Sequence, residues 1–258
     1  MTPSGMDIVP QPDIGDAFGE ALLAQLAGAG PGGHGEDRTD IVYERDDGFI
    51  ASDSSDYFAE PKRWDDRDRW ALDYVRGRVL DLGAGAGRAC LALQKRKHDV
   101  LALDVSPGAI ETCRRRGVQE TFLGDITELA SDPSQKFDTF LALGNNLGLL
   151  GTPEQAARMF DAFTALANPG ATIVGTCLDP TAGEPPPWHA SYHERNRANG
   201  LPPGQIKLRV RFRDTASEWF DLFWMSPEEL DELAMRSGWE VAQVRPGLPY
   251  GAILVQLE

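Results

Sequence analysis

The 258-residue sequence is poor in cysteine and in positive charge. Its three cysteines, Cys90, Cys113 and Cys177, lie far apart and form neither a CxxC motif nor a disulfide framework, so we interpret them as small buried apolar residues in a reducing compartment. Lys and Arg number 25 against 40 Asp and Glu, which gives a formal net charge of −15. This balance argues against nucleic acid or an anionic membrane as a partner, because both attract clustered basic residues.

Targeting and membrane signals are also missing. No Lys or Arg precedes Arg38, so the basic start of a secretory signal is absent, and no apolar run reaches the ~18 residues of a membrane span. With the cysteine usage, this predicts a cytoplasmic protein without a membrane partner. The length and the hydrophobic content of 41% suit one large α/β domain.

The chain divides into a lead-in and one domain. Residues 1–40 are rich in Gly, Pro and acidic residues, and we expect a flexible segment with a short helix at Ala17–Leu26. Residues 41–258 are predicted to form a single domain. Within it, 41–77 is expected to be a cap region with a helix at Trp64–Val75, and 179–225 a lid insertion with a β-hairpin.

Strands and helices alternate from residue 78 onward, which predicts a mostly parallel sheet covered by helices on both faces. The hairpin of the insertion is predicted from Ile206–Phe212 and Glu218–Trp224. The strands expected in the sheet are Arg78–Leu82, Asp99–Asp104, Gln119–Leu123, Asp138–Leu143, Ala171–Cys177, Trp239–Val244 and Ala252–Leu257.

A glycine turn follows the first of these strands. The apolar run that contains Asp81 leads into three glycines spaced by two, Gly83, Gly85 and Gly87, and a predicted helix follows. Glycines let the backbone approach a bulky ligand where a Cβ would clash, and the helix N-terminus offers unpaired N–H groups. This pattern is typical of a nucleotide-binding corner.

A carboxylate accompanies the turn. Asp104 ends the next predicted strand, about 20 residues after Gly83, where a carboxylate can accept both hydroxyls of a ribose. Arg88 occupies the sixth position at which a dinucleotide fingerprint has glycine, so a pyrophosphate fits this turn less well. An NAD(P)-dependent oxidoreductase stays a less favoured alternative.

Val79–Gly87 resembles the first motif of the class I S-adenosylmethionine (SAM) dependent methyltransferases at every position. The resemblance implies an α/β, Rossmann-like, seven-stranded sheet, mostly parallel with the last strand antiparallel. It also implies roles for individual residues. Gly83, Ala84 and Gly85 would lie against the methionine part of SAM, Asp104 would hold the ribose with Val105 beside the adenine, Asp125 with Ile126 would meet the adenine, and Gly144 and Asn145 would face the sulfonium.

Candidates for the acceptor side are weaker. His189 and His193 are one helical turn apart, and either could act as a general base, although a polar lid face is the simpler interpretation. We expect no metal, because no third ligand is placed by the sequence. Asn145 could orient a substrate, and Tyr57 could meet the sulfonium by a cation–π contact.

The sequence therefore predicts a SAM-dependent methyltransferase acting on a small molecule, as a monomer or homodimer and without nucleic acid. Two alternatives stay open. A protein or peptide methyltransferase would use the alternating basic residues Lys207, Arg209, Arg211 and Arg213 as a docking edge. A regulatory protein would bind SAM without turnover.

Overall fold

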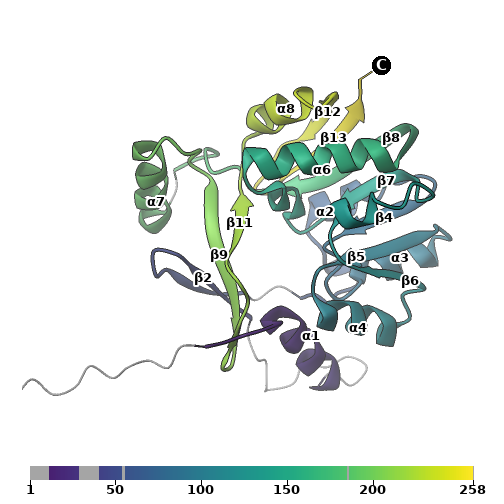
Figure 1. Cartoon of the computed structure of the whole chain (residues 1–258), viewed down its shortest axis with the longest axis horizontal. Coiled ribbons are helices and arrows are strands. Elements are labelled where there is room, and N and C mark those ends of the chain that lie inside the picture. Colours follow the sequence, from purple (N-terminus) through teal and green to yellow (C-terminus); the bar gives the residue numbers. More distant parts are fainter. Residues whose placement is uncertain (1–11, 29–40, 54–55, 185, 258) are drawn as a thin grey trace, which may run out of the picture.

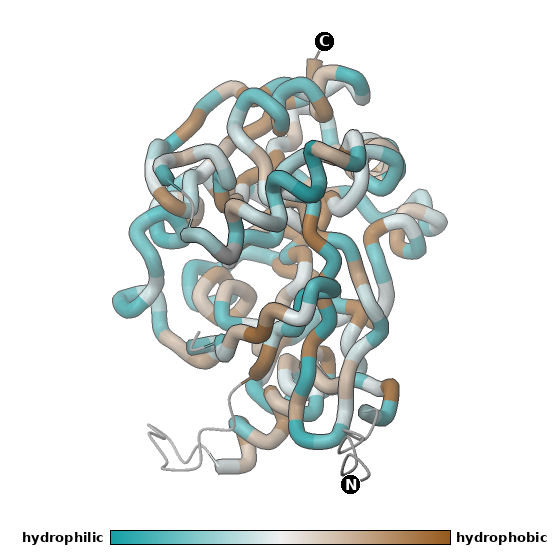
Figure 2. The backbone as a smooth tube through the Cα atoms, turned by 90° about the vertical axis from the view of Figure 1, so that its left-hand side faces the viewer, coloured by the Kyte–Doolittle hydropathy of each residue, from teal (hydrophilic) through white to brown (hydrophobic). Residues whose placement is uncertain are grey.

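The computed structural model describes residues 12–28, 41–53, 56–184 and 186–257. Two sheets dominate it, a large one flanked by helices and a smaller one beside it that includes β2, β9 and β11 (Figure 1). Along the tube, apolar residues concentrate in the inner strands and polar residues in the outer turns (Figure 2). No helix within these described ranges is long and apolar enough to cross a membrane.

The large sheet has seven strands in the order β12-β13-β8-β7-β4-β5-β6. The pairs among β4, β5, β6, β7 and β8 are parallel, whereas β13 runs antiparallel to both of its neighbours. This confirms the predicted fold class. The strands are β4 Val79–Leu82, β5 Val100–Asp104, β6 Glu120–Leu123, β7 Phe137–Ala142, β8 Ala167–Cys177, β12 Trp239–Arg245 and β13 Tyr250–Gln256.

Helices cover both faces of this sheet, and each face has its own core. One core is formed with α5, α6 and α8 and contains Phe140, Phe163 and Trp239. The other is formed with α2, α3 and α4 and contains Leu93 and Cys113. The helices are α2 Asp66–Ala71, α3 Arg88–Lys95, α4 Pro107–Arg116, α5 Ile126–Leu129, α6 Pro153–Leu166 and α8 Pro227–Met235.

The second sheet has the order β1-β10-β9-β2-β3, and β11 also pairs with β9, on the edge opposite β2. The predicted hairpin is present, because β9 and β11 pair antiparallel. Residues 179–225 contain α7 Pro187–Ala198 together with β9, β10 and β11. The strands are β1 Asp13–Ile14, β2 Ile41–Arg45, β3 Ile50–Asp53, β9 Gln205–Phe212, β10 Thr215–Ala216 and β11 Phe220–Phe223.

The cap region at 41–77 contains two strands and less helix than the sequence suggested. Its first part forms the antiparallel strands β2 and β3, and β2 pairs with β9. The helix expected from Trp64 to Val75 is reduced to the 3₁₀ turn Pro61–Arg63 and to α2, because the Asp65 carboxylate caps the Arg67 N–H and starts the helix there.

Helix α1 (Ala17–Gly28) lies in the segment expected to be flexible, yet it packs against α4 (Figure 1). The Asp16 carboxylate accepts hydrogen bonds from the Ser106 hydroxyl at 2.8 Å and the Gly108 N–H at 2.7 Å. The two helices cross at glycines, since a Cβ on Gly19 would lie 2.6 Å from the Cα of Gly108. Residues 12–28 are therefore part of the folded body, while 1–11 and 29–40 lie outside the described residues.

Candidate cofactor and acceptor site

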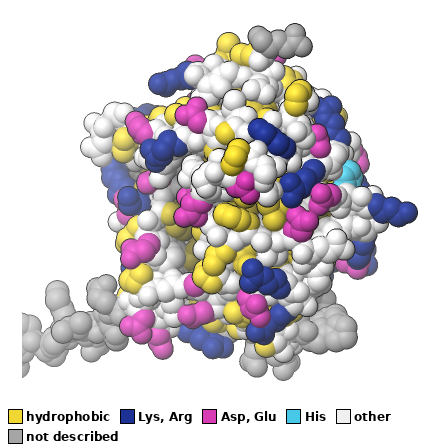
Figure 3. Space-filling model, turned by 45° about the vertical axis from the view of Figure 1, so that its right-hand side comes forward, with side chains coloured by type: hydrophobic (Ala, Val, Ile, Leu, Met, Phe, Trp, Pro, Cys, Tyr) yellow, Lys and Arg dark blue, Asp and Glu magenta, His cyan; other side chains and the backbone are white. Residues whose placement is uncertain are grey.

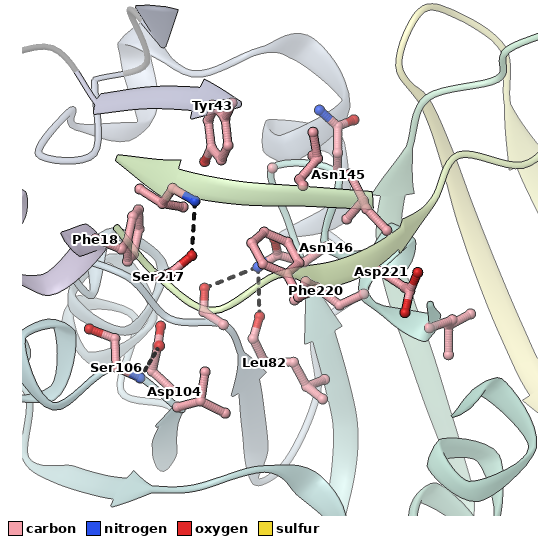
Figure 4. A pocket seen from close by; sticks show the side chains of 18 of the residues that line it. Phe18, Tyr43, Leu82, Asp104, Ser106, Asn145, Asn146, Ser217, Phe220 and Asp221 are labelled. Atoms are coloured by element: carbon pink, nitrogen blue, oxygen red, sulfur yellow. Dashed lines mark hydrogen bonds between the residues drawn. The ribbon is translucent and has the colours of Figure 1, made fainter. Parts of the chain in front are cut away.

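A cavity of about 1200 Å³ lies between the two sheets. Leu82, Asp104 and Ser106 reach it from the large sheet, whereas Tyr43 and Phe220 reach it from the second sheet (Figure 4). The first group stands at the carboxyl ends of the parallel strands, where open α/β sheets bind their ligands. The cavity is thus walled on one side by the candidate nucleotide corner and on the other by the second sheet.

The glycine turn adopts backbone conformations that side chains disfavour. Gly83, Gly85 and Gly87 have φ values of +65°, +55° and +72°. A Cβ on Gly83 would lie 2.6 Å from Nδ2 of Asn146. Asn146 donates from this nitrogen to the carbonyl oxygens of Leu82 and Gly83, at 2.8 and 3.0 Å. The amide therefore holds the turn in place, a function that the sequence pattern did not assign to it.

Asp104 faces the cavity and is bonded to the turn. Its carboxylate accepts from the Gly85 N–H at 2.8 Å and from the Ser106 N–H at 2.9 Å. Burial raises the pKa of Asp104 to about 6, although these two backbone hydrogen bonds act in the opposite direction. A carboxylate fixed at a strand end beside the turn has the position that a ribose-binding acid requires.

Asp81 lies deeper. It is buried beneath the turn, accepts a hydrogen bond from the Cys90 thiol at 3.1 Å, and has a pKa raised by burial to about 6. Among the described residues, the cavity lining includes Gly83 but not Asp81, Ala84, Gly85 or Gly87. The predicted contact of these four residues with a cofactor stays a prediction.

Three predicted adenine-side residues, Val105, Asp125 and Ile126, line the cavity together. The Asp125 carboxylate caps α5 by accepting the N–H groups of Thr127 and Glu128. Burial favours a higher pKa for Asp125, but the hydrogen bond from the Thr127 hydroxyl and those from the two N–H groups outweigh it and lower the pKa below its ordinary value. Val105 is 69% exposed at the rim.

Gly144 and Asn145 follow β7 and also line the cavity. The Gly144 N–H donates to the buried carboxylate of Asp68 at 3.2 Å, and the same carboxylate pairs with Arg88. Asn145 has a φ of +69°, and within the described part of the chain its buried Oδ1 has no hydrogen-bond partner. Asp68 thus connects α2 to the site, which no local sequence signal indicated.

The two histidines occupy different environments on α7. His189 lines the cavity, and its Nδ1 lies 3.1 Å from Nη1 of Arg45. Because a guanidinium only donates, Nδ1 accepts and Nε2 carries the proton of the neutral ring, an assignment made from the hydrogen bonding. Burial first, and then the Arg45 charge, lower the pKa of His189. This contact makes Nδ1 an acceptor, and a role of His189 as a general base stays a prediction.

His193 is buried and is not one of the described residues that line the cavity. Burial, followed by the neighbouring His189, lowers its pKa, and its Nε2 has no partner among the described residues. The rings of the two histidines stack with centroids 6.2 Å apart. The described residues contain no group of three or more ligating side chains that could hold a metal ion.

The basic residues of β9 are mostly neutralised in place. Arg209 and Arg211 both pair with Glu44 of β2, at 2.8 and 3.3 Å, and Lys207 lies 3.8 Å from Asp221. On the face shown in Figure 3, acidic and basic side chains are interspersed with hydrophobic ones. The alternation therefore serves the internal pairing of the second sheet.

Comparisons with known proteins agree with this architecture. A family model described as a methyltransferase domain matches residues 79–170. A SAM-dependent methyltransferase from Bacteroides fragilis, crystallised with S-adenosyl-L-homocysteine (SAH), has a TM-score of 0.77 at 23% identity, covering 94% of this chain and 95% of that one. One from Methanosarcina mazei has a TM-score of 0.55 at 18% identity, with coverages of 72% and 96%. The CcbJ methyltransferase from Streptomyces caelestis has a TM-score of 0.54 at 17% identity, covering 80% of this chain and 100% of that one.

Residues 79–170 thus match a methyltransferase domain, and the strand order and the glycine turn belong to the fold that solved SAM-dependent methyltransferases share. The structural likeness, at these identities, establishes the fold.

Proposed function

We propose that the protein transfers the methyl group of SAM to a small-molecule acceptor bound in the cavity between the two sheets. The size of this cavity carries the proposal. At about 1200 Å³ it exceeds the 300–1,000 Å³ typical of a site for one ligand, so it can hold the cofactor and a second molecule together. Its second wall is apolar and aromatic, with Phe49, Leu208, Phe220 and Trp224.

The residues present fit SAM. Gly83 borders the cavity at a position where a Cβ would clash with Asn146, so the backbone itself forms the cradle. Asp104 would accept the ribose hydroxyls, and Asp125 would accept from the adenine amino group. On the sulfonium side, Asn145 would offer its Oδ1, which has no partner among the described residues. When bound, SAM supplies a methyl group already activated on a positively charged sulfur.

The remaining work of the protein is positioning. In-line displacement requires the nucleophile, the methyl carbon and the sulfur to be aligned in a site that excludes water. The second sheet forms the wall opposite the cofactor residues and can hold the acceptor against them. The net charge of −15 supports an acceptor other than nucleic acid. A cytoplasmic location and a monomeric or homodimeric state stay predictions from the sequence.

Calorimetric titration with SAH tests the cofactor part of this proposal. We expect binding with a micromolar or lower Kd, and a loss of at least tenfold in Gly83→Ala. Gly117→Ala is the matched control, since Gly117 also has a positive φ, +94°, but a Cβ there meets nothing within 4 Å. Absence of SAH binding to the wild type, or equal loss in both variants, would contradict the proposed cofactor site.

Mass spectrometry of the products tests the acceptor part. The protein is incubated with SAM and either a small-molecule fraction or a peptide fraction of a cell extract, and SAH formation is followed. Formation of SAH only with the small-molecule fraction is the expected result. Methylation confined to the peptide fraction would favour a protein methyltransferase, and SAH binding without turnover in either fraction would favour a regulatory protein.

A further inference from the structure

Three polar residues form a hydrogen-bonded chain on the second-sheet side of the cavity. Tyr43 of β2, Asp53 of β3 and Tyr57 all line it. The Tyr57 hydroxyl donates to the Asp53 carboxylate, and the hydroxyl oxygens of Tyr43 and Tyr57 are 3.2 Å apart. We name this cluster the Tyr43–Tyr57–Asp53 chain. The sequence suggested Tyr57 as a contact of the sulfonium, but it did not suggest Tyr43 or Asp53 as site residues.

The direction of the hydrogen bonds decides what this chain can bind. Each phenol has one proton, and Tyr57 gives its proton to the carboxylate, the stronger acceptor. Tyr43 must therefore donate to Tyr57, which leaves the lone pairs of the Tyr43 oxygen as its remaining hydrogen-bonding capacity. Burial raises the pKa of Tyr43 to about 12 and raises that of Tyr57 well above its ordinary value, so both phenols stay neutral. The chain thus presents acceptors, and a carboxylate charge, to a ligand.

The position of the chain places it beside the cofactor residues. A Cβ on Gly85 would lie 3.7 Å from the Tyr57 ring, and Phe18 packs edge-on against the same ring with centroids 5.4 Å apart. A group bound by Tyr43 and Asp53 therefore lies close to the glycine turn.

The charge around the cavity is negative, like that of the Tyr43–Tyr57–Asp53 chain. Its lining contains six carboxylates, two guanidinium groups and His189 among the described residues. One of the guanidinium groups, that of Arg45, is engaged by Asp47 at 2.7 Å. The carboxylates that line the cavity are Asp16, Asp53, Asp104, Asp125, Glu218 and Asp221, and of these Asp221 lies 3.8 Å from Lys207. A cationic ligand is therefore favoured over an anionic one.

We propose that the Tyr43–Tyr57–Asp53 chain is the subsite for the amino group of the methyl acceptor, and that the acceptor is an amine with an aromatic or otherwise apolar body. This inference rests on the proposed function, because it names the substrate class of that same cavity. An ammonium group has only donors, which matches the lone pairs of Tyr43 and the Asp53 carboxylate. Its nitrogen can accept the methyl group only after one proton has passed to the Asp53 carboxylate and freed the lone pair. The aromatic side chains Phe18, Phe49, Trp219, Phe220 and Trp224 line the space for the body.

Two probes of nearly equal shape test the proposal. 2-Phenylethylamine, which is an ammonium ion at neutral pH, and 2-phenylethanol, its neutral counterpart, are titrated into SAH-saturated protein by calorimetry or ligand-observed NMR. In the wild type we expect the amine to bind at least tenfold more tightly than the alcohol. Asp53→Asn should remove this preference, and Tyr43→Phe should weaken amine binding several-fold, because one acceptor is lost.

Glu44→Gln is the matched control. Glu44 follows Tyr43 on β2 but pairs with Arg209 and Arg211, and it is absent from the cavity lining of the described residues. Its variant should keep the amine preference, and SAH affinity should stay within about twofold in all three variants. SAH binding also shows that each variant is folded, and Tyr43→Phe alone still tests the subsite if Asp53→Asn does not fold.

The inference is overturned by equal binding of the two probes to the wild type, by a preference that survives in Asp53→Asn and Tyr43→Phe, or by no binding of either probe at millimolar concentration to SAH-loaded protein. Failure of SAH itself to bind would instead refute the proposed function. The two failures are therefore distinguishable in the same titration series.

Discussion

The pH dependence of SAH binding is the most direct test of the ionisation of Asp104. In the free protein its pKa is raised to about 6, mainly by burial. A ribose that donates two hydroxyl groups to the ionised carboxylate lowers this pKa in the complex. The free protein then holds more protons than the complex below about pH 6, so SAH affinity falls as the pH decreases through that value and is constant above it.

The magnitude follows from the ionised fraction. With a pKa of about 6, about one quarter of the Asp104 carboxyl groups are ionised at about pH 5.5, so the Kd for SAH at that pH should be about fourfold higher than at about pH 8. Calorimetry in two buffers with different ionisation enthalpies should show net proton release on binding near pH 6.

The variants separate Asp104 from its buried neighbour. Asp104→Asn should bind SAH about 10- to 100-fold more weakly, because hydrogen bonds to a charged group contribute about 1.5–3 kcal/mol, and its affinity should no longer vary with pH. Asp81→Asn is the control, since Asp81 has a similarly raised pKa but is not among the described lining residues. A flat wild-type profile, or the same slope in Asp104→Asn, would refute the reasoning.

Other perturbations test the parts that position the site. Asn146→Ala removes two hydrogen bonds to the glycine turn, so SAH affinity measured by calorimetry should fall at least several-fold, and an unchanged Kd would contradict this. Asp16→Ala removes the acceptor of the Ser106 hydroxyl, so urea unfolding should show a free energy of unfolding lower by about 1–3 kcal/mol. An unchanged free energy of unfolding would contradict the packing of α1 against α4. Phe140→Ala empties a fully buried position and should cost about 3–5 kcal/mol in the same assay, whereas a loss below 1 kcal/mol would disagree with the packing.

The large sheet could be predicted from the sequence because its signals are local. Ser106 caps α4 and Pro107 begins it, both residue types that favour a helix start, and the apolar run from 140 to 143 marks the end of β7. The glycine turn and Asp104 adjoin each other in the structure, as their spacing indicated. In each case a residue and its neighbours within one element determine the conformation.

The second sheet could not be predicted in the same way. Tyr43 of β2 pairs with Val210 of β9, far along the chain, and nothing in residues 41–53 specifies that partner. The helix assigned to part of the cap region came from its aromatic and charged residues, whose periodicity is ambiguous over so short a span. Asn146 and Asp68 were missed because they act on the backbone of distant segments, at Gly83 and Gly144.

The construction of the second sheet has a consequence for protein engineering. Its strands come from three stretches of the chain, at 13–14, 41–53 and 205–223, which lie on both sides of the nucleotide corner in sequence. The surface that faces a substrate is therefore not a cassette that one pair of crossover points could transplant. A chimera meant to carry its selectivity to another scaffold would have to graft all three stretches together and preserve the pairing of β2 with β9.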